Sequence, residues 1–155
     1  MQLTRSGARR IALIHGPNLN MLGVRDPEIY GKEDFPSLNK RIEAYAKQIG
    51  IDVTIQQSNS EGAIIDFVQD ARGWAEVVII NPGAYTHYSY AIRDALADTR
   101  LPIIEVHISN VHAREDFRRH SVISPITTGQ IVGLGPHGYL LALDAAKRLI
   151  EDSHR

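Results

Sequence analysis

Four short, largely apolar runs rich in β-branched residues constrain the fold of this chain more than any other feature. They occupy residues 11–14, 51–55, 77–80 and 103–108. Runs of this length and composition are typical of parallel strands that are buried on both faces of a sheet. A fifth strand is predicted at residues 129–133. The sequence therefore predicts a five-stranded parallel sheet.

Amphipathic helices are predicted between these strands. The first is expected to follow Pro36-Ser37 and to end at Gly50. A second helix begins after a Ser60 cap, and a third covers residues 89–97. A last helix follows the fifth strand. The residues expected to face inward are Leu38, Ile42, Tyr45, Ala46 and Ile49, then Ile64, Phe67, Val68 and Ala71, then Ile92, Ala95 and Leu96, and finally Tyr139, Leu143, Ala146, Leu149 and Ile150.

This alternation predicts an α/β fold, because right-handed crossovers place helices on both faces of a parallel sheet. We predict a flavodoxin-like three-layer sandwich with strand order 2-1-3-4-5, built as one catalytic domain from residues 1–155. Ligands of such sheets bind beyond the carboxyl ends of the strands. Chemistry is therefore expected in the segments that follow strands, at residues 15–18, 81–87 and 105–110.

Composition argues against several kinds of site and partner. Without cysteine the chain has no disulfide and no Cys-ligated metal, and its seven histidines lack the HExxH spacing, so no metal is expected. The 17 Lys and Arg balance 18 Asp and Glu, which indicates neither nucleic acid nor an anionic membrane as a partner. No apolar run approaches the ~20 residues of a membrane span. We expect a cytoplasmic protein whose residues 1–9 form a flexible, basic tail.

Residues 19–31 are predicted to form a mobile active-site lid, because the stretch is long for a strand-to-helix connection and is punctuated by Gly and Pro. It carries Arg25 and Tyr30. A tyrosine acts as a base at neutral pH only where cations stabilise its phenolate, and Arg25 is a candidate for that task. The alternative is that the Tyr30 ring merely packs beneath the loop.

Glu105 and His107 are expected to project to the same side of their strand, since side chains alternate along it. A carboxylate beside an imidazole fixes its tautomer and favours the imidazolium, which a general acid requires. A structural ion pair is an equal alternative.

Two further segments carry candidate binding groups. The turn that starts at Asn81 is interpreted as the opening of a helix whose backbone N–H groups suit a carboxylate or a polyol, or as an ordinary cap. Arg114 and Arg118, four residues apart, are predicted to share a helical face that binds a carboxylate. The alternative is a solvated charged surface.

Taken together, several motifs resemble those of the type II 3-dehydroquinate dehydratases. They occur in the family's order and extend from residue 11 to the last helix. The matching stretches are GPNLNMLG and RDPEIYG at 16–31, NPGAYTHYSYAIRDA at 81–95, IEVHISNVHAREDFRRHS at 104–121 and IVGLGPHGY at 131–139. His15, where Asn is common, and Asp26 depart from the family pattern without touching an assigned role.

The resemblance implies anti-elimination of water from 3-dehydroquinate to give 3-dehydroshikimate through an enolate, in the shikimate pathway or in quinate breakdown. No metal or organic cofactor is implied. Tyr30 would remove the C2 proton with support from Arg25. His107, oriented by Glu105, would protonate the leaving hydroxyl, and Asn18 would hold the ordered water or the enolate oxygen.

The resemblance also implies a set of substrate contacts and an assembly. Ile108 and Ser109 would hold the substrate carboxylate, Arg118 a ring hydroxyl, and Arg114 would support Tyr30. Asp94 would reach the site of a neighbouring subunit in a dodecamer, a tetramer of trimers. The full substrate-binding set is Asn81, His87, Asp94, Ile108, Ser109, Arg114 and Arg118.

Two other functional classes share this sheet order, because a fold does not determine a function. A phospho-acceptor receiver needs an acidic pair after the first strand, and a flavin-binding module needs a hydroxyl-rich phosphate loop there. The chain has His15-Gly16-Pro17-Asn18 at that place, which argues against both. A third alternative is an inactive scaffold, which is disfavoured by the joint presence of Tyr30, Arg25, His107 and Glu105.

Overall fold

The computed structural model describes residues 9–155, so most of the predicted tail, residues 1–8, lies outside the described residues. The strands are β1 (Arg10–His15), β2 (Asp52–Gln57), β3 (Val77–Asn81), β4 (Ile103–His107) and β5 (Gly129–Val132). The α-helices are α1 (Pro27–Tyr30), α2 (Phe35–Ile49), α3 (Glu61–Ala71), α4 (Tyr90–Thr99) and α5 (His137–Ser153). Short 3-10 helices are η1 (Leu19–Met21), η2 (Gly83–His87), η3 (Val111–Ala113), η4 (Asp116–Arg119) and η5 (Ser124–Ile126).

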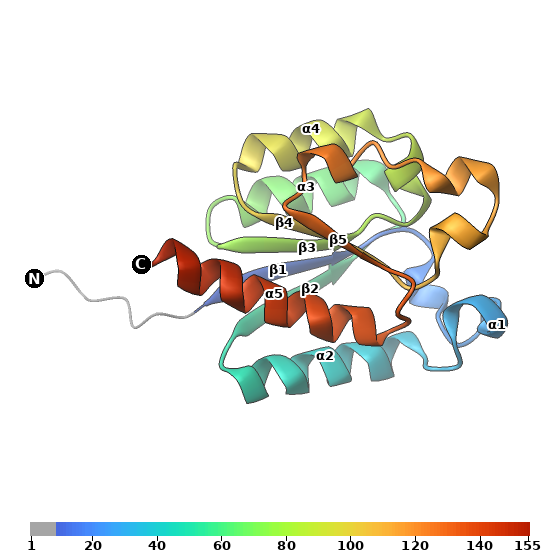
Figure 1. The fold of residues 1–155 in the computed structure, drawn as a ribbon, viewed down its shortest axis with the longest axis horizontal. Coiled ribbons are helices and arrows are strands. Elements are labelled where there is room, and N and C mark those ends of the chain that lie inside the picture. The colour runs from blue at the N-terminus through green and yellow to red at the C-terminus, as the bar shows by residue number, and fades with distance from the viewer. Residues whose placement is uncertain (1–8) are drawn as a thin grey trace, which may run out of the picture.

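The strands form one parallel sheet in the order β2-β1-β3-β4-β5, which confirms the predicted fold. Helices α2 and α5 cover one face of the sheet, and α3 and α4 cover the other (Figure 1). Helix α1 and several 3-10 helices gather beyond the carboxyl ends of the strands. This end of the molecule is where the fold class predicts a ligand site.

The central strands are buried on both faces, which explains their continuous apolar runs. Alternate residues serve the two sides of the sheet. Ile11 and Leu13 join the core beneath α2 and α5, whereas Ala12 and Ile14 join the core beneath α3 and α4. The chain therefore builds two apolar layers from one strand sequence.

Helix starts follow the predicted capping chemistry with two corrections. The Ser60 and Ser89 side chains accept hydrogen bonds from backbone N–H groups at the starts of α3 and α4, as expected of caps. Helix α2 begins at Phe35 rather than after Ser37, because the Asp34 carboxylate caps it. The turn after Asn81 does not open α4 directly, since the 3-10 helix η2 intervenes.

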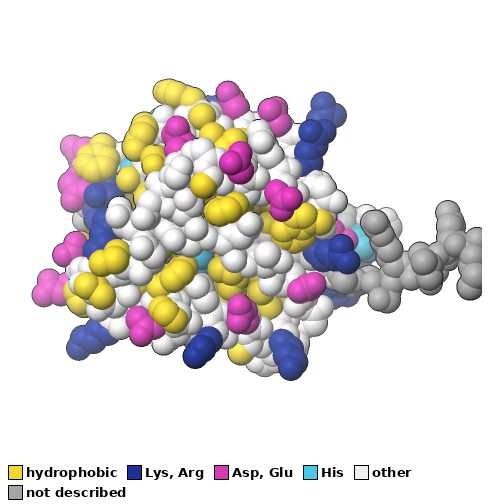
Figure 2. Space-filling view, turned by 180° about the vertical axis from the view of Figure 1, so that it is seen from behind, with side chains coloured by type: hydrophobic (Ala, Val, Ile, Leu, Met, Phe, Trp, Pro, Cys, Tyr) yellow, Lys and Arg dark blue, Asp and Glu magenta, His cyan; other side chains and the backbone are white. Residues whose placement is uncertain are grey.

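Arg9, which the tail prediction included, contacts the folded domain. Its guanidinium donates a hydrogen bond to Glu151 at 3.0 Å, and its carbonyl accepts one from the Asp52 N–H at 2.8 Å. Acidic and basic side chains alternate over the face seen in Figure 2, in line with the balanced composition. Within residues 9–155, none of the helices combines the length and apolarity that a bilayer crossing requires.

The loop after β1 passes very close to the loop after β3, and Gly16 permits this approach. A Cβ atom at Gly16 would lie 2.6 Å from the carbonyl carbon and oxygen of Pro82. Both atoms belong to the backbone and cannot move aside as a flexible side chain would. Absence of a side chain at Gly16 is therefore a condition for the two segments to meet.

We predict that Gly16→Ala lowers the free energy of unfolding by about 1–3 kcal/mol, the usual cost of overpacking. Urea denaturation measures this change. Gly129→Ala is the matched control, because a Cβ at Gly129 meets nothing within 4 Å and its stability should stay near that of the parent. Equal stability of the two variants would contradict the close-approach argument.

Candidate functional site

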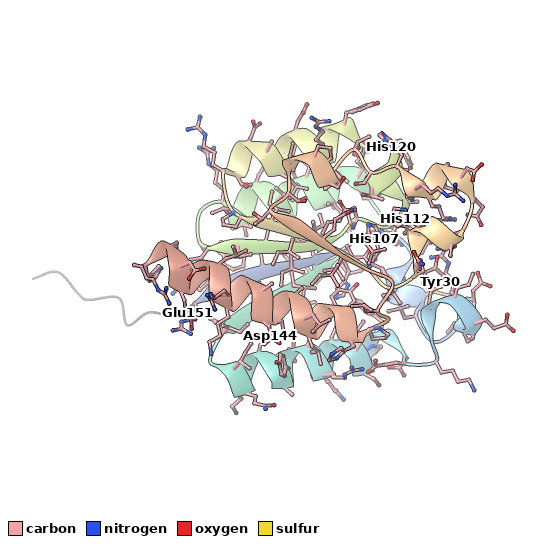
Figure 3. The ribbon with its side chains drawn as sticks, viewed as in Figure 1. Tyr30, His107, His112, His120, Asp144 and Glu151 are labelled. Atoms are coloured by element: carbon pink, nitrogen blue, oxygen red, sulfur yellow. The ribbon has the colours of Figure 1, made fainter. Side chains whose placement is uncertain are left out.

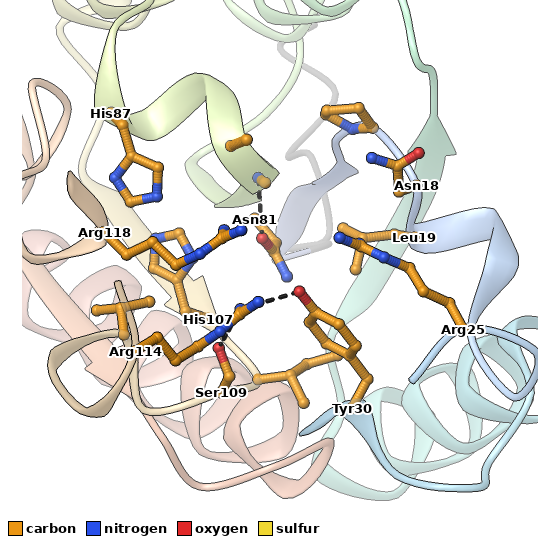
Figure 4. Close-up of a pocket in the computed structure, with 15 residues that line it drawn as sticks. Asn18, Leu19, Arg25, Tyr30, Asn81, His87, His107, Ser109, Arg114 and Arg118 are labelled. Atoms are coloured by element: carbon orange, nitrogen blue, oxygen red, sulfur yellow. Dashed lines mark hydrogen bonds between the residues drawn. The ribbon is translucent and has the colours of Figure 1, made fainter. Parts of the chain in front are cut away.

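A pocket opens beyond the carboxyl ends of the central strands and collects most of the predicted site residues. Tyr30 and His107 lie at this end of the molecule, whereas Asp144 and Glu151 lie along α5 (Figure 3). The lining residues are Pro17, Asn18, Leu19, Arg25, Tyr30, Asn81, Gly83, Ala84, His87, His107, Ile108, Ser109, Val111, Arg114 and Arg118 (Figure 4). Of the predicted residues, Glu105 and Asp94 do not line this pocket.

Tyr30 reaches the pocket with its hydroxyl while its ring packs into the core, so both interpretations of this residue describe part of its environment. Arg114 Nη1 donates a hydrogen bond to the Tyr30 hydroxyl at 2.9 Å. The Arg25 guanidinium carbon lies 4.6 Å from the centre of the Tyr30 ring. Two cations thus flank the phenol, but the one bonded to its oxygen is Arg114.

Arg114 and Arg118 converge on the pocket without sharing a helical face, which corrects the predicted geometry. Arg114 has extended backbone angles and separates η3 from η4, and Arg118 lies in η4. Arg114 also donates to Ser109 Oγ at 3.1 Å, while Arg118 pairs with Glu115. The extended backbone at Arg114 ends the helical path that the four-residue spacing had suggested.

Glu105 and His107 interact as predicted. His107 Nε2 and Glu105 Oε2 lie 2.5 Å apart, and the carboxylate is fully buried beneath the imidazole. Thr86 Oγ1 donates to Glu105 Oε2 at 2.7 Å, and Ser121 Oγ donates to Oε1 at 3.0 Å. Burial raises the pKa of Glu105, but hydrogen bonds from His107, Thr86 and Ser121 outweigh it, so the pKa lies below its usual range.

His87 lies at the rim of the pocket, half-buried. Its Nδ1 donates to the carbonyl of His120 at 2.8 Å, which assigns the proton to that nitrogen when the ring is neutral. Burial lowers the pKa of His87 more than the bond to His120 raises it, so its pKa lies below the usual value. The neutral imidazole is therefore the favoured form at neutral pH.

Asn81 contacts the pocket at one end and a buried polar chain at the other. Its Nδ2 donates to the Tyr139 hydroxyl at 2.9 Å, and its Oδ1 accepts from the Gly83 N–H at 3.1 Å. The Tyr139 oxygen lies 3.2 Å from His15 Nδ1, and His15 Nε2 lies 3.0 Å from Asn39 Oδ1. The three side chains that form this hydrogen-bonded series, Asn81, Tyr139 and His15, are all buried.

The remaining predicted residues differ in their relation to the pocket. Asn18 is exposed on its wall in a left-handed conformation, with a φ of 69°, and its N–H donates to Asn59 Oδ1. Ile108 and Ser109, which follow β4 directly, also line the pocket. Asp94 is exposed on α4 and lies outside the pocket of its own chain.

Comparison with known proteins identifies the family. A family model described as Dehydroquinase class II matches residues 9–147. The chain belongs to this family. The 3-dehydroquinate dehydratase of Lachnoclostridium phytofermentans is 61% identical over 137 residues, which cover 88% of this chain and 94% of that protein.

Solved structures agree with this assignment. The crystal structure of type II dehydroquinase from Butyrivibrio crossotus matches with a TM-score of 0.89 and 52% identity, covering 90% of this chain and 98% of that one. The type II dehydroquinase from Propionibacterium acnes gives a TM-score of 0.87 at 45% identity, covering 90% and 97% of the two chains. The three-layer fold is thus shared with enzymes of the class II dehydroquinase family.

Four polar residues of this class II dehydroquinase site were not predicted from the sequence. Thr86 and Ser121 lie within the recognised motifs, but nothing in their spacing indicates that both bond to Glu105. Tyr139 was predicted only to face inward from its helix, and Asn39 was not predicted at all. For Tyr139 the available signal was a hydroxyl at a position that the helical pattern places inside.

The buried His15 makes stability depend on pH. Burial lowers its pKa from 6.5 to about 4, although the bond to Asn39 opposes this shift. Because the unfolded chain binds the proton first, stability present above pH 6.5 is lost as the pH falls toward 4. We predict that the loss in free energy of unfolding reaches about 3 kcal/mol at pH 4, relative to neutral pH.

The measurement is urea denaturation of the parent and of His15→Asn between pH 7 and pH 4. The difference in free energy of unfolding between the two isolates the histidine, because Glu105 and His87 titrate in both. As the pH falls, the free energy of unfolding of the parent should decrease relative to that of His15→Asn. Parallel curves would show that His15 does not titrate as argued.

Proposed function

We propose that the chain catalyses dehydration of 3-dehydroquinate to 3-dehydroshikimate by anti-elimination through an enolate. Family membership supports the choice of reaction. The observation that carries it is that one pocket contains a tyrosine flanked by cations and a histidine bonded to a buried carboxylate. These are opposite electrostatic environments, and they suit a base and an acid respectively.

Tyr30 is the proposed base, and Arg25 and Arg114 are proposed to make it effective. A phenolate next to two guanidinium groups is stabilised by the nearby positive charge, and the hydrogen bond from Arg114 favours the same form. In this form Tyr30 removes the C2 proton of the substrate. The resulting enolate is held by Asn18, which also lines the pocket.

His107 is the proposed acid for the leaving hydroxyl. Its Nε2 is bonded to Glu105, so Nδ1 is the ring nitrogen that gives the proton to the substrate. Glu105 stabilises the protonated imidazole from behind, where Thr86 and Ser121 hold the carboxylate in place. Tyr30 ends α1 and His107 ends β4, so the proposed base and the proposed acid enter the pocket from different elements.

The other lining residues are proposed to bind the substrate. Ile108 and Ser109 hold the carboxylate through backbone N–H and hydroxyl groups, and Arg118 binds a ring hydroxyl. Asn81 and His87 add contacts from the loop after β3. Residues 19–31 act as the lid, since this segment carries Arg25 and Tyr30 and places several large apolar side chains in solvent. These exposed side chains are Met21, Val24 and Ile29.

We predict that Tyr30→Phe and His107→Ala each lower kcat about 10²–10⁴-fold, the usual contribution of a positioned base or acid. Turnover of 3-dehydroquinate is followed by the ultraviolet absorbance of the conjugated enone product, with a chelator present. Tyr45→Phe and His154→Ala are the controls, because both side chains lie away from the pocket, and they should keep parental activity.

An inert parent chain would refute the dehydratase proposal and favour an inactive scaffold. Full activity in either site variant would remove that residue from its role. A yellow preparation that binds flavin would instead support the flavin-binding alternative.

We also propose that the chain assembles as a dodecamer, a tetramer of trimers, in which Asp94 serves the site of a neighbouring subunit. Asp94 is exposed and does not line the pocket of its own chain, as such a role requires. We predict that Asp94→Asn lowers kcat/KM about tenfold or more, as loss of a charged hydrogen bond does, while the exposed Asp98→Asn does not. Analytical ultracentrifugation measures the assembly.

Co-expression of Asp94→Asn with Tyr30→Phe chains tests whether Asp94 acts between subunits. Mixed assemblies contain sites that pair an intact Tyr30 with an intact Asp94 from a neighbour, so part of the activity should return. Failure to recover activity beyond that of the separate variants would rule out a role between subunits.

A further inference from the structure

We propose that His15 is a positioning residue for Asn81 and acts through the Tyr139 hydroxyl. His15 accepts a hydrogen bond from the Tyr139 hydroxyl, so the Tyr139 oxygen in turn accepts a hydrogen bond from Asn81. The Asn81 carboxamide then offers its N–H donor to the substrate. The effect on substrate binding rests on the proposed function, whereas the direction of the hydrogen bonds among these three residues does not.

The sheet places the three groups together. His15 is paired with Asn81 in the register between β1 and β3, so both side chains point to the face covered by α2 and α5. Tyr139 lies in α5, and its hydroxyl contacts both His15 and Asn81. All three side chains are buried, and those of His15 and Tyr139 are fully buried. Buried polar groups of this kind must satisfy one another, because water does not reach them.

The direction of these hydrogen bonds follows from the groups at the two ends of the hydrogen-bonded series, the Gly83 N–H and Asn39. Asn81 Oδ1 accepts from the Gly83 N–H, so Nδ2 is the atom that faces Tyr139. The Tyr139 oxygen therefore accepts, and its own proton needs a second acceptor. His15 Nδ1, at 3.2 Å, is that acceptor among the described residues.

The tautomer of His15 agrees with this direction. Asn39 Oδ1 accepts from Nε2, which leaves Nδ1 of the neutral ring without a proton and free to accept. Burial keeps the ring neutral, since it lowers the pKa of His15 to about 4. Packing also restrains the ring, because Phe35 meets it edge-on with 4.9 Å between ring centroids.

The consequence for the site lies in the second hydrogen on Asn81 Nδ2. One hydrogen is bonded to Tyr139, and the other is available to the pocket that Asn81 lines. If Tyr139 donated toward Asn81 instead, the carboxamide would have to turn and give up its bond from Gly83. His15 thereby selects the donor side of Asn81 without itself lining the pocket.

Two substitutions separate the two bonds of His15. The amide oxygen of Asn lies where the histidine carries Nδ1, so His15→Asn retains an acceptor for Tyr139 and loses the bond to Asn39. Gln places its amide nitrogen near the position of Nε2, so His15→Gln retains the donor to Asn39 and loses the acceptor. The two variants thus test the route through Tyr139 against a merely structural role.

We expect His15→Asn to stay within about threefold of the parent in kcat/KM for 3-dehydroquinate. His15→Gln and Tyr139→Phe should each lose roughly tenfold, chiefly through KM, as removal of one hydrogen bond predicts. The double variant His15→Gln/Tyr139→Phe should lose no more than either single variant, because both break the same link. Thermal unfolding of each variant monitors the fold.

Equal losses in His15→Asn and His15→Gln, or a larger loss in His15→Asn, would overturn the proposal. Additive losses in the double variant would do the same. A second measurement does not need activity: ¹⁵N NMR of histidine-labelled protein reports the tautomer of His15. A proton on Nδ1 would refute the inference even if the parent proved inert, whereas an inert parent with Nδ1 unprotonated would refute only the proposed function.

Discussion

The parallel register of β1, β3 and β4 is the constraint on which the rest of this structure depends. It ends three strands at one edge and sets His15 beside Asn81. The close approach of Gly16 to Pro82 holds the loops after β1 and β3 together at this edge. The pocket is thus built from loops whose starting points are determined by sheet hydrogen bonds, which gives its groups a rigid base.

The pocket separates charge in a way that matches its two proposed proton transfers. Guanidinium groups surround Tyr30, and a buried carboxylate lies behind His107. Positive charge stabilises a negatively charged group beside it, and negative charge stabilises a positively charged one. The two proposed roles therefore differ in the charge of the neighbouring protein groups.

Both faces of the sheet contribute a buried polar arrangement to the same edge. On the side of α3 and α4, Thr86 and Ser121 satisfy Glu105. On the side of α2 and α5, Tyr139 joins His15 to Asn81. An unpaired buried polar group costs free energy, so each arrangement is stable only when all of its members are present. This dependence explains how residues outside the pocket can restrain those that line it.

The sequence by itself determined the five strands, the four longer helices and the two serine caps, because these follow from local periodicity and from hydrogen bonds between near neighbours. Its motifs also indicated the family and the Glu105–His107 pair, whose members lie on one strand. The resemblance implied that Arg114 supports Tyr30, but only the tertiary structure decided that it does so by a hydrogen bond to the hydroxyl, across 84 residues of sequence. Only the tertiary structure decided, too, that Tyr139 connects Asn81 with His15, which lies 124 residues from Tyr139. Such contacts depend on how distant segments meet, and the extended backbone at Arg114 shows that residue spacing alone does not predict that meeting.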